Sequence, residues 1–108
     1  MNTKEFKMAT SAREFLEKKI GPMTIGKLIR SYRTSNDLTA QAVAEILEVN
    51  RSFITNIENG RKHISLEMVL KIAKKLKESP ELYALVWFEE EARRGGVSFE
   101  KIAKMRIA

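Results

Sequence analysis

Residues 38–61 of this chain read LTAQAVAEILEVNRSFITNIENGR, and this segment has the clearest structural pattern in the sequence. The pattern predicts two short helices joined by a tight turn, over about 40–47 and 51–58. Thr39 and Asn50 stand where each helix needs an N-terminal cap. The second helix keeps a polar outer face of the size and chemistry that enters a DNA major groove. The apolar residues that hold the two helices at a fixed angle are Val43, Ala44, Leu47, Val49, Ile54 and Ile57.

The rest of the chain also has helical spacing and no sustained alternation of polar and apolar residues, so we expect an all-α protein. A five-helix core needs three more helices, over about 25–36, 66–77 and 80–94, with Ser65 and Ser79 as caps of the last two. The predicted core stripe of the 66–77 helix is Leu66, Val69, Leu70, Ala73 and Leu76.

Both ends of the chain add short helical segments to this core. Ser11 and Glu14 form a capping box for a helix over about 12–20, and Ser98 caps a tail helix that runs through Met105. We therefore expect three parts. These are an N-terminal helical extension (1–23), a domain that carries the two-helix motif (24–94) and a C-terminal tail that is a candidate interface (95–108).

The composition limits the classes of function. The chain has 108 residues, 44% of them hydrophobic and 31% charged, which indicates one globular domain. The absence of cysteine excludes disulfides and thiolate metal sites, and it is compatible with a cytoplasmic protein. No apolar run reaches the length of a membrane span, so no membrane partner is expected. A net charge of +6 favours a polyanionic partner such as DNA.

The outward residues of the 51–58 helix have the chemistry of base readout. Arg51 can form a bidentate pair with guanine and Asn56 with adenine, while Ser52 and Thr55 can bond a base or a phosphate. Phe53 stands at the edge of the same face. The alternative from the residues alone is an ordinary solvated helix surface.

The stretch ends in Ile57-Glu58-Asn59-Gly60-Arg61, and with this run the chain resembles the lambda-repressor-like (Cro/cI-type, XRE family) helix-turn-helix regulators over 25–76. The resemblance implies an all-α fold and binding of double-stranded DNA. It assigns base reading to Arg51, Ser52 and Thr55, with Asn56 and Phe53 at more variable positions. It also implies an ion pair between Arg33 and Glu58 near the DNA backbone.

The resemblance further implies a set of phosphate contacts, from Asn59, Gly60 and Arg61 and, by extension, Lys62. Many relatives carry glutamine where this chain has Ala40, so the contact made there is assigned to the neighbouring Thr39 and Gln41. Relatives also favour glycine at the turn position held by Glu48, where the backbone adopts positive φ. The sequence thus predicts a strained residue in this turn.

Catalytic chemistry finds little support in the sequence. His63 is the only histidine and has no second ligand at metal spacing, so we expect a solvent or phosphate contact rather than a metal site. Residues 89–91 are three consecutive glutamates, interpreted as a solvated face. Lys71, Lys74, Lys75 and Lys77 are interpreted in the same way. We expect no enzymatic activity and no cofactor.

The predicted 80–94 helix carries more apolar bulk than one side of a helix can bury in a small core. Tyr83, Trp87 and Phe88 are therefore candidates for a dimer interface. The alternative is that Gly95 and Gly96 let the tail fold back over this surface.

Together these features indicate a sequence-specific DNA-binding transcriptional regulator, a repressor that acts as a homodimer. A single recognition helix reads few bases, so dimerisation is expected on mechanistic grounds. The alternative is an antitoxin of the same superfamily, which binds a protein toxin partner and represses its own operon.

Overall fold

The computed structural model describes residues 21–98, 101 and 104. Within them the chain forms five helices and no strand: α2 (Ile25–Ser35), α3 (Ala40–Leu47), α4 (Arg51–Glu58), α5 (Leu66–Lys75) and α6 (Pro80–Arg94). The all-α class and the five core helices are confirmed. The helix predicted over 12–20 and nearly all of the tail helix lie outside the described residues.

Each helix begins at a polar side chain that accepts a hydrogen bond from the first turn. Thr39 accepts from the amide of Ala42, Asn50 from that of Phe53. Thr24, Ser65 and Ser79 cap α2, α5 and α6 in the same way. These bonds satisfy amides that have no partner inside the helix, which is why the helix starts follow from local sequence.

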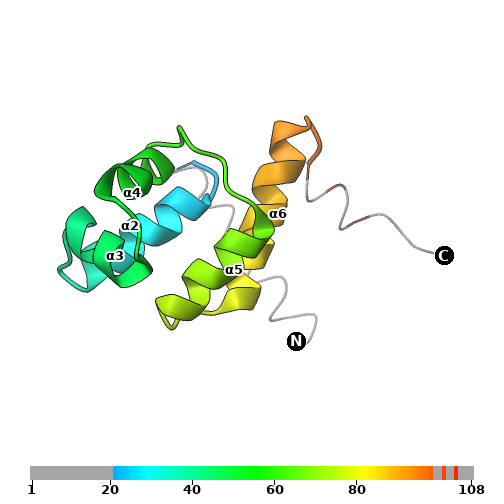
Figure 1. The fold of residues 1–108 in the computed structure, drawn as a ribbon. Coiled ribbons are helices and arrows are strands. Elements are labelled where there is room, and N and C mark those ends of the chain that lie inside the picture. The colour runs from blue at the N-terminus through cyan, green and yellow to red at the C-terminus, as the bar shows by residue number, and fades with distance from the viewer. Residues whose placement is uncertain (1–20, 99–100, 102–103, 105–108) are drawn as a thin grey trace.

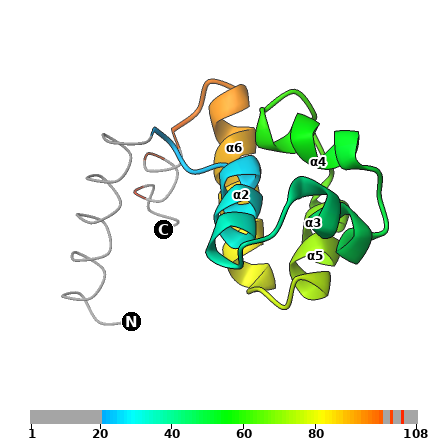
Figure 2. The same ribbon diagram turned by 90° about the vertical axis from the view of Figure 1, so that its left-hand side faces the viewer.

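The five helices pack in two groups around one hydrophobic core. In Figure 1, α3 and α4 lie at one end of the molecule beside α2, whereas α5 and α6 form a pair at the other end. Helix α2 contacts both α4 and α6, and in Figure 2 it lies in front of α6 with α3 and α4 to one side. Each of the five described helices contributes one of the most completely buried large side chains, and these are Ile29, Val43, Ile54, Val69 and Tyr83.

The stripe of α5 differs from the prediction by a rotation of the helix. Val69, Ala73 and Leu76 are buried as expected, but Leu66 and Leu70 are only half-buried and Ile72 takes a core position. The helix also ends at Lys75, two residues earlier than predicted, since Lys77 adopts φ +58°. The buried face of α5 is therefore formed by Val69, Ile72, Ala73 and Leu76.

Tyr83 was predicted at a dimer interface, and this was wrong. Its side chain is only 2% exposed and lies in the core of its own chain. Burial, together with nearby Glu78 and Tyr32, raises the pKa of the phenol to about 12. Tyr83 therefore has no surface to offer a second subunit. Trp87 is half-buried and Phe88 is 49% exposed.

The glutamates at 89–91 do not form a solvated face, contrary to the interpretation of the sequence. Glu89 is 3% exposed. Glu90 accepts a hydrogen bond from the Ile25 amide at 2.6 Å and so stabilises the start of α2. Glu91 lies 3.2 Å from His63. Two of these carboxylates thus join α6 to segments far away in sequence.

No helix in the described part of the chain is long and apolar enough to cross a membrane.

Candidate nucleic-acid interface

The turn between α3 and α4 is built on a left-handed residue. Glu48 adopts φ +58° and ψ +43°, and its amide donates to the carbonyls of Ala44 and Glu45. The prediction of positive φ at this residue is therefore confirmed. Ala44 is fully buried, so its small side chain lets α4 approach α3 closely. The Glu48 carboxylate meets Lys75 of α5 at 3.1 Å, a contact between exposed groups.

The outer face of α4 has the composition that the sequence predicted. Arg51 and Ser52 are exposed, while Thr55 and Asn56 are half-buried. The Ser52 hydroxyl donates to Asn50 Oδ1 at 2.7 Å, and the Thr55 hydroxyl donates to the backbone carbonyl oxygen of Ser52 at 3.2 Å. These local bonds fix the orientation of both hydroxyls. The face thus presents one long cation beside short, oriented polar groups.

The end of α4 is closed by a glycine in the left-handed region. Gly60 has φ +71°, its amide donates to Ile57 O at 3.1 Å, and the Arg61 amide donates to Asn56 O at 2.8 Å. This pair of bonds is the Schellman arrangement. It fixes Asn59, Gly60 and Arg61, which are all exposed, against the end of the helix.

A cluster of charges braces this end against α2. Arg33 contacts both carboxylate oxygens of Glu58, at 2.8 and 3.0 Å. Arg30 Nε donates to the same carboxylate at 3.1 Å, and Arg30 Nη2 lies 3.4 Å from Asn59 Oδ1. The Glu58 side chain is only 4% exposed, whereas that of Arg30 is 53% exposed. Two cations face one carboxylate, so the cluster keeps a net positive charge beside Asn59.

The pKa of Glu58 reflects two opposed effects. Burial of the carboxylate raises its pKa, but hydrogen bonds from Arg33 and Arg30 outweigh this and hold it below the ordinary value. The same bond with Glu58 raises the pKa of Arg33. Both partners therefore stay charged. Sequence reasoning missed Arg30, although its spacing of three residues from Arg33 places both on one face of α2.

Phe53 has a different environment from the one predicted for a base reader. Its ring is half-buried and packs against the core, and the Lys62 ammonium lies 5.3 Å from the ring centroid. A cation at this distance from an aromatic face is attracted by the ring. Phe53 and Lys62, one from α4 and one from the loop after it, are thus brought together.

At the start of α3, Thr39 and Gln41 are both exposed. The Gln41 amide donates to Glu45 at 3.3 Å along the same helix. His63 follows the phosphate-loop candidates, but it contacts Glu91 and stacks on Trp87 with ring centroids 6.5 Å apart. Among the residues described, no group of three or more histidines and acids is arranged to hold a metal ion.

Comparison with known proteins agrees with this geometry. The helix-turn-helix family profile matches residues 29–83, which is half of the chain. The control protein C.SmaI of Serratia marcescens is 33% identical over 51 residues, which are 47% of this chain and 61% of that protein. The chain thus spans less than two thirds of the length of this relative.

Two solved structures are also similar. The restriction-modification controller protein C.AhdI from Aeromonas hydrophila is 29% identical, with 55% of this chain and 86% of that one covered and a TM-score of 0.49. The clp gene regulator ClgR from Corynebacterium glutamicum is 24% identical, with 74% and 83% covered and a TM-score of 0.51, and it supports the fold. The chain belongs to the XRE-type helix-turn-helix family of DNA-binding regulators.

Proposed function

We propose that residues 24–94 bind duplex DNA sequence-specifically, that the protein acts as a homodimer and that it represses transcription. The observation that carries this proposal is the outer face of α4. Arg51 and Ser52 are exposed there, beside the rigid end formed by Asn59, Gly60 and Arg61. Similarity to a control protein supports a regulatory role.

In this proposal, one set of residues contacts the bases and a different set contacts the phosphates of the DNA. Arg51, Ser52, Thr55 and Asn56 read base edges in the major groove, and Phe53 contributes at the edge of the same face. Thr39, Gln41, Asn59, Gly60, Arg61 and Lys62 bind phosphates and fix the position of α4 on the duplex. The pair of Arg33 and Glu58 supports the second group, because it joins the end of α4 to α2.

The test compares a reader with an anchor. Arg51→Ala should cost about 1–3 kcal/mol on the preferred site and relax the base preference at one position. Arg61→Ala should weaken binding to all sequences alike and reduce the salt slope by about one unit. Binding selection on random duplexes, followed by a salt titration, measures both. An unchanged preferred sequence in Arg51→Ala would contradict the assignment of α4 as the reader.

The proposal of a homodimer is supported by the exposed apolar residues of α6, Leu82, Leu85 and Phe88. A two-fold dimer would place two recognition helices about 34 Å apart, so the site would be an inverted repeat. Phe88→Glu should shift the wild-type dimer to monomers in ultracentrifugation. A wild type that stays monomeric at high micromolar concentration would contradict the dimer and favour the antitoxin alternative, in which a toxin covers this face.

A further inference from the structure

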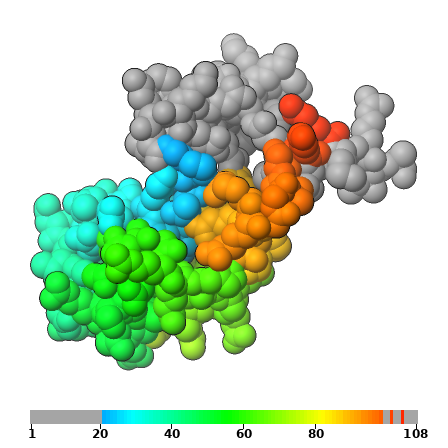
Figure 3. Space-filling view, turned by 90° about the horizontal axis from the view of Figure 1, so that it is seen from above, coloured from blue at the N-terminus to red at the C-terminus, as the bar shows by residue number. Residues whose placement is uncertain are grey.

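A cavity of about 500 Å³ lies outside the residues assigned so far to base reading. It is bounded by the start of α2, the loop after α4 and the last turns of α6. We call it the basic groove, because its cationic residues are Lys27, Arg30, Lys62, Arg93 and Arg94. Figure 3 shows these three segments, in blue, green and orange, meeting on one face of the molecule.

The groove has a strong excess of positive charge. Five cations line it against two carboxylates, those of Glu58 and Glu90. Glu58 is paired with Arg30, one of these five cations, and with Arg33, which is an additional one. Glu90 accepts a hydrogen bond from the Ile25 amide, and Arg94 lies 4.0 Å from Glu91, so the surplus of positive charge remains. The positive end of the α2 helix dipole adds to the same field. An anion is therefore the ligand that this charge pattern favours.

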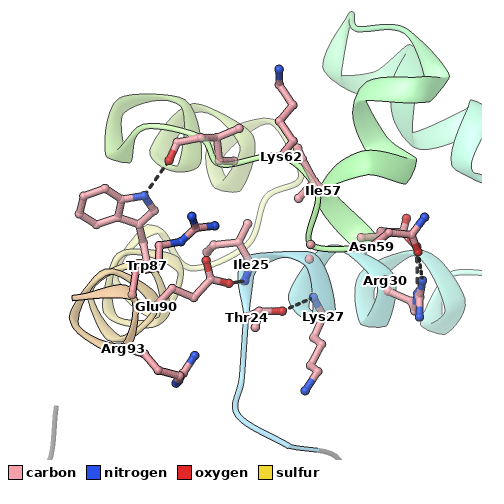
Figure 4. A pocket seen from close by; sticks show the side chains of 15 residues that line it. Thr24, Ile25, Lys27, Arg30, Ile57, Asn59, Lys62, Trp87, Glu90 and Arg93 are labelled. Carbon is pink, nitrogen blue, oxygen red and sulfur yellow. Dashed lines mark hydrogen bonds and ion pairs between the residues drawn. The ribbon is translucent and has the colours of Figure 1, made fainter. Parts of the chain in front are cut away.

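Contacts between distant segments hold the three walls in place. Trp87 Nε1 donates to Ile64 O at 2.8 Å, which ties α6 to the loop after α4, and Glu90 ties α6 to α2. Figure 4 shows both bonds on one side of the groove, with Lys62 and Arg93 at opposite edges. The walls of a groove held in this way do not have to be ordered when a ligand binds, so the helices that carry its charges are already in place.

The groove is continuous with the loop after α4 (residues 59–62), which is proposed above to contact DNA phosphates. Asn59, Gly60 and Lys62 line it and also belong to that loop. A DNA strand carries one phosphate for every ~3.4 Å along the helix axis, so a backbone bound at Asn59 presents further phosphates to neighbouring cations. Arg93 and Arg94 are exposed at the end of α6, where they extend the positive surface beyond the loop.

We propose that the basic groove binds backbone phosphates of DNA that flanks the base-read site, with Arg93 and Arg94 as contacts from α6. This inference rests on the proposed function, because it needs duplex binding by α4. It extends the footprint to base pairs whose sequence is not read. Affinity should therefore depend on duplex length as well as on sequence.

The test uses the full chain and two duplexes that carry the selected site. One ends at the edge of the site, and the other has five additional base pairs of arbitrary sequence on each side. Each phosphate contact contributes about 0.9 to the slope of log affinity against log salt. The wild type should show a steeper slope on the long duplex, by about one to two units for each subunit.

The variant Arg93→Gln/Arg94→Gln should lose this difference and bind the long duplex about tenfold more weakly at 0.1 M salt. On the short duplex it should equal the wild type. The matched control is Lys71→Gln/Lys74→Gln, which removes the same charge from exposed residues of α5 outside the groove. Equal long-duplex binding by both double variants would overturn the inference, as would equal weakening of the groove variant on both duplexes.

Two further results separate this inference from its alternatives. A wild type that binds neither duplex contradicts the proposed function itself, whereas a wild type that binds both without a length effect contradicts only the groove. Trp87 is the sole tryptophan and lines the groove, so its fluorescence reports ligands there. Saturable quenching by micromolar inorganic pyrophosphate would assign the groove to a free phosphate compound and overturn the assignment to DNA backbone.

Discussion

Replacing Gly26 by alanine tests how closely α2 approaches α4. A Cβ atom at Gly26 would lie 2.3 Å from the carbonyl oxygen of Ile57 and 3.1 Å from Glu58 Cα. Carbon and oxygen cannot approach so closely, and both neighbours are backbone atoms. The carbonyl cannot turn aside, since it accepts the hydrogen bond of Gly60 that closes α4. The two helices must therefore move apart by about 0.7 Å or more.

The sign of the change in stability shows whether the added Cβ atom clashes with α4. Overpacking of this kind costs about 1–3 kcal/mol. Without the clash, alanine would stabilise the helix by about 0.4–1 kcal/mol through the unfolded state. For a domain of this size, 1 kcal/mol corresponds to about 4–8 °C, so we expect Gly26→Ala to lower the melting temperature by about 5–20 °C.

The matched control is Gly95→Ala at the end of α6. Gly95 has φ −81°, and the nearest atom to its added Cβ is 3.6 Å away, an ordinary contact. Thermal unfolding followed by circular dichroism compares the two variants, and urea unfolding gives the free energies. If Gly26→Ala melts at or above the temperature of Gly95→Ala, the close approach of α2 to α4 is wrong.

Two further predictions follow from the turn and the charge cluster. Glu48→Gly should stabilise the fold by up to about 1 kcal/mol, since glycine adopts φ +58° without strain and the lost pair with Lys75 is exposed; a lower melting temperature would contradict this. Glu58→Gln should destabilise the protein by about 1–3 kcal/mol at pH 7, because it leaves Arg33 without its partner. The folded-state pKa of Glu58 lies below its ordinary value of 4.5, so this difference should persist above pH 4.5 and disappear as acid protonates the carboxylate; a difference that stays constant down to pH 2 would argue against the ion pair.

The features that were predictable from sequence depend on residues close together in the chain. Thr39 and Asn50 bond amides three residues away, and the left-handed conformation of Glu48 was expected from the resemblance, because relatives favour glycine at this position of the turn. Such local rules place the starts of the helices and the motif correctly. The role of Arg30 could also have been predicted, because its spacing from Arg33 puts both side chains on the face of α2 that meets Glu58.

The features that were not predictable depend on contacts between distant segments. Hydropathy marks Tyr83 as apolar bulk, but only the packing of α6 on α5 and α2 shows that its ring belongs to the core. Glu90 resembles a solvated acid until α2 places the Ile25 amide 2.6 Å away. Gly26 carries no signal in the sequence, because the requirement for glycine comes from a carbonyl 31 positions along the chain.

Those distant contacts converge on the first turns of α2, and this has a consequence for DNA binding. Gly26 sets the distance to α4, Glu90 holds the Ile25 amide, and Arg30 joins Glu58 to the edge of the basic groove. The proposed reader and the proposed groove therefore share one support. A change that displaces α2 should weaken base readout and flanking phosphate contacts together, whereas changes at Arg51 or at Arg93 should separate them.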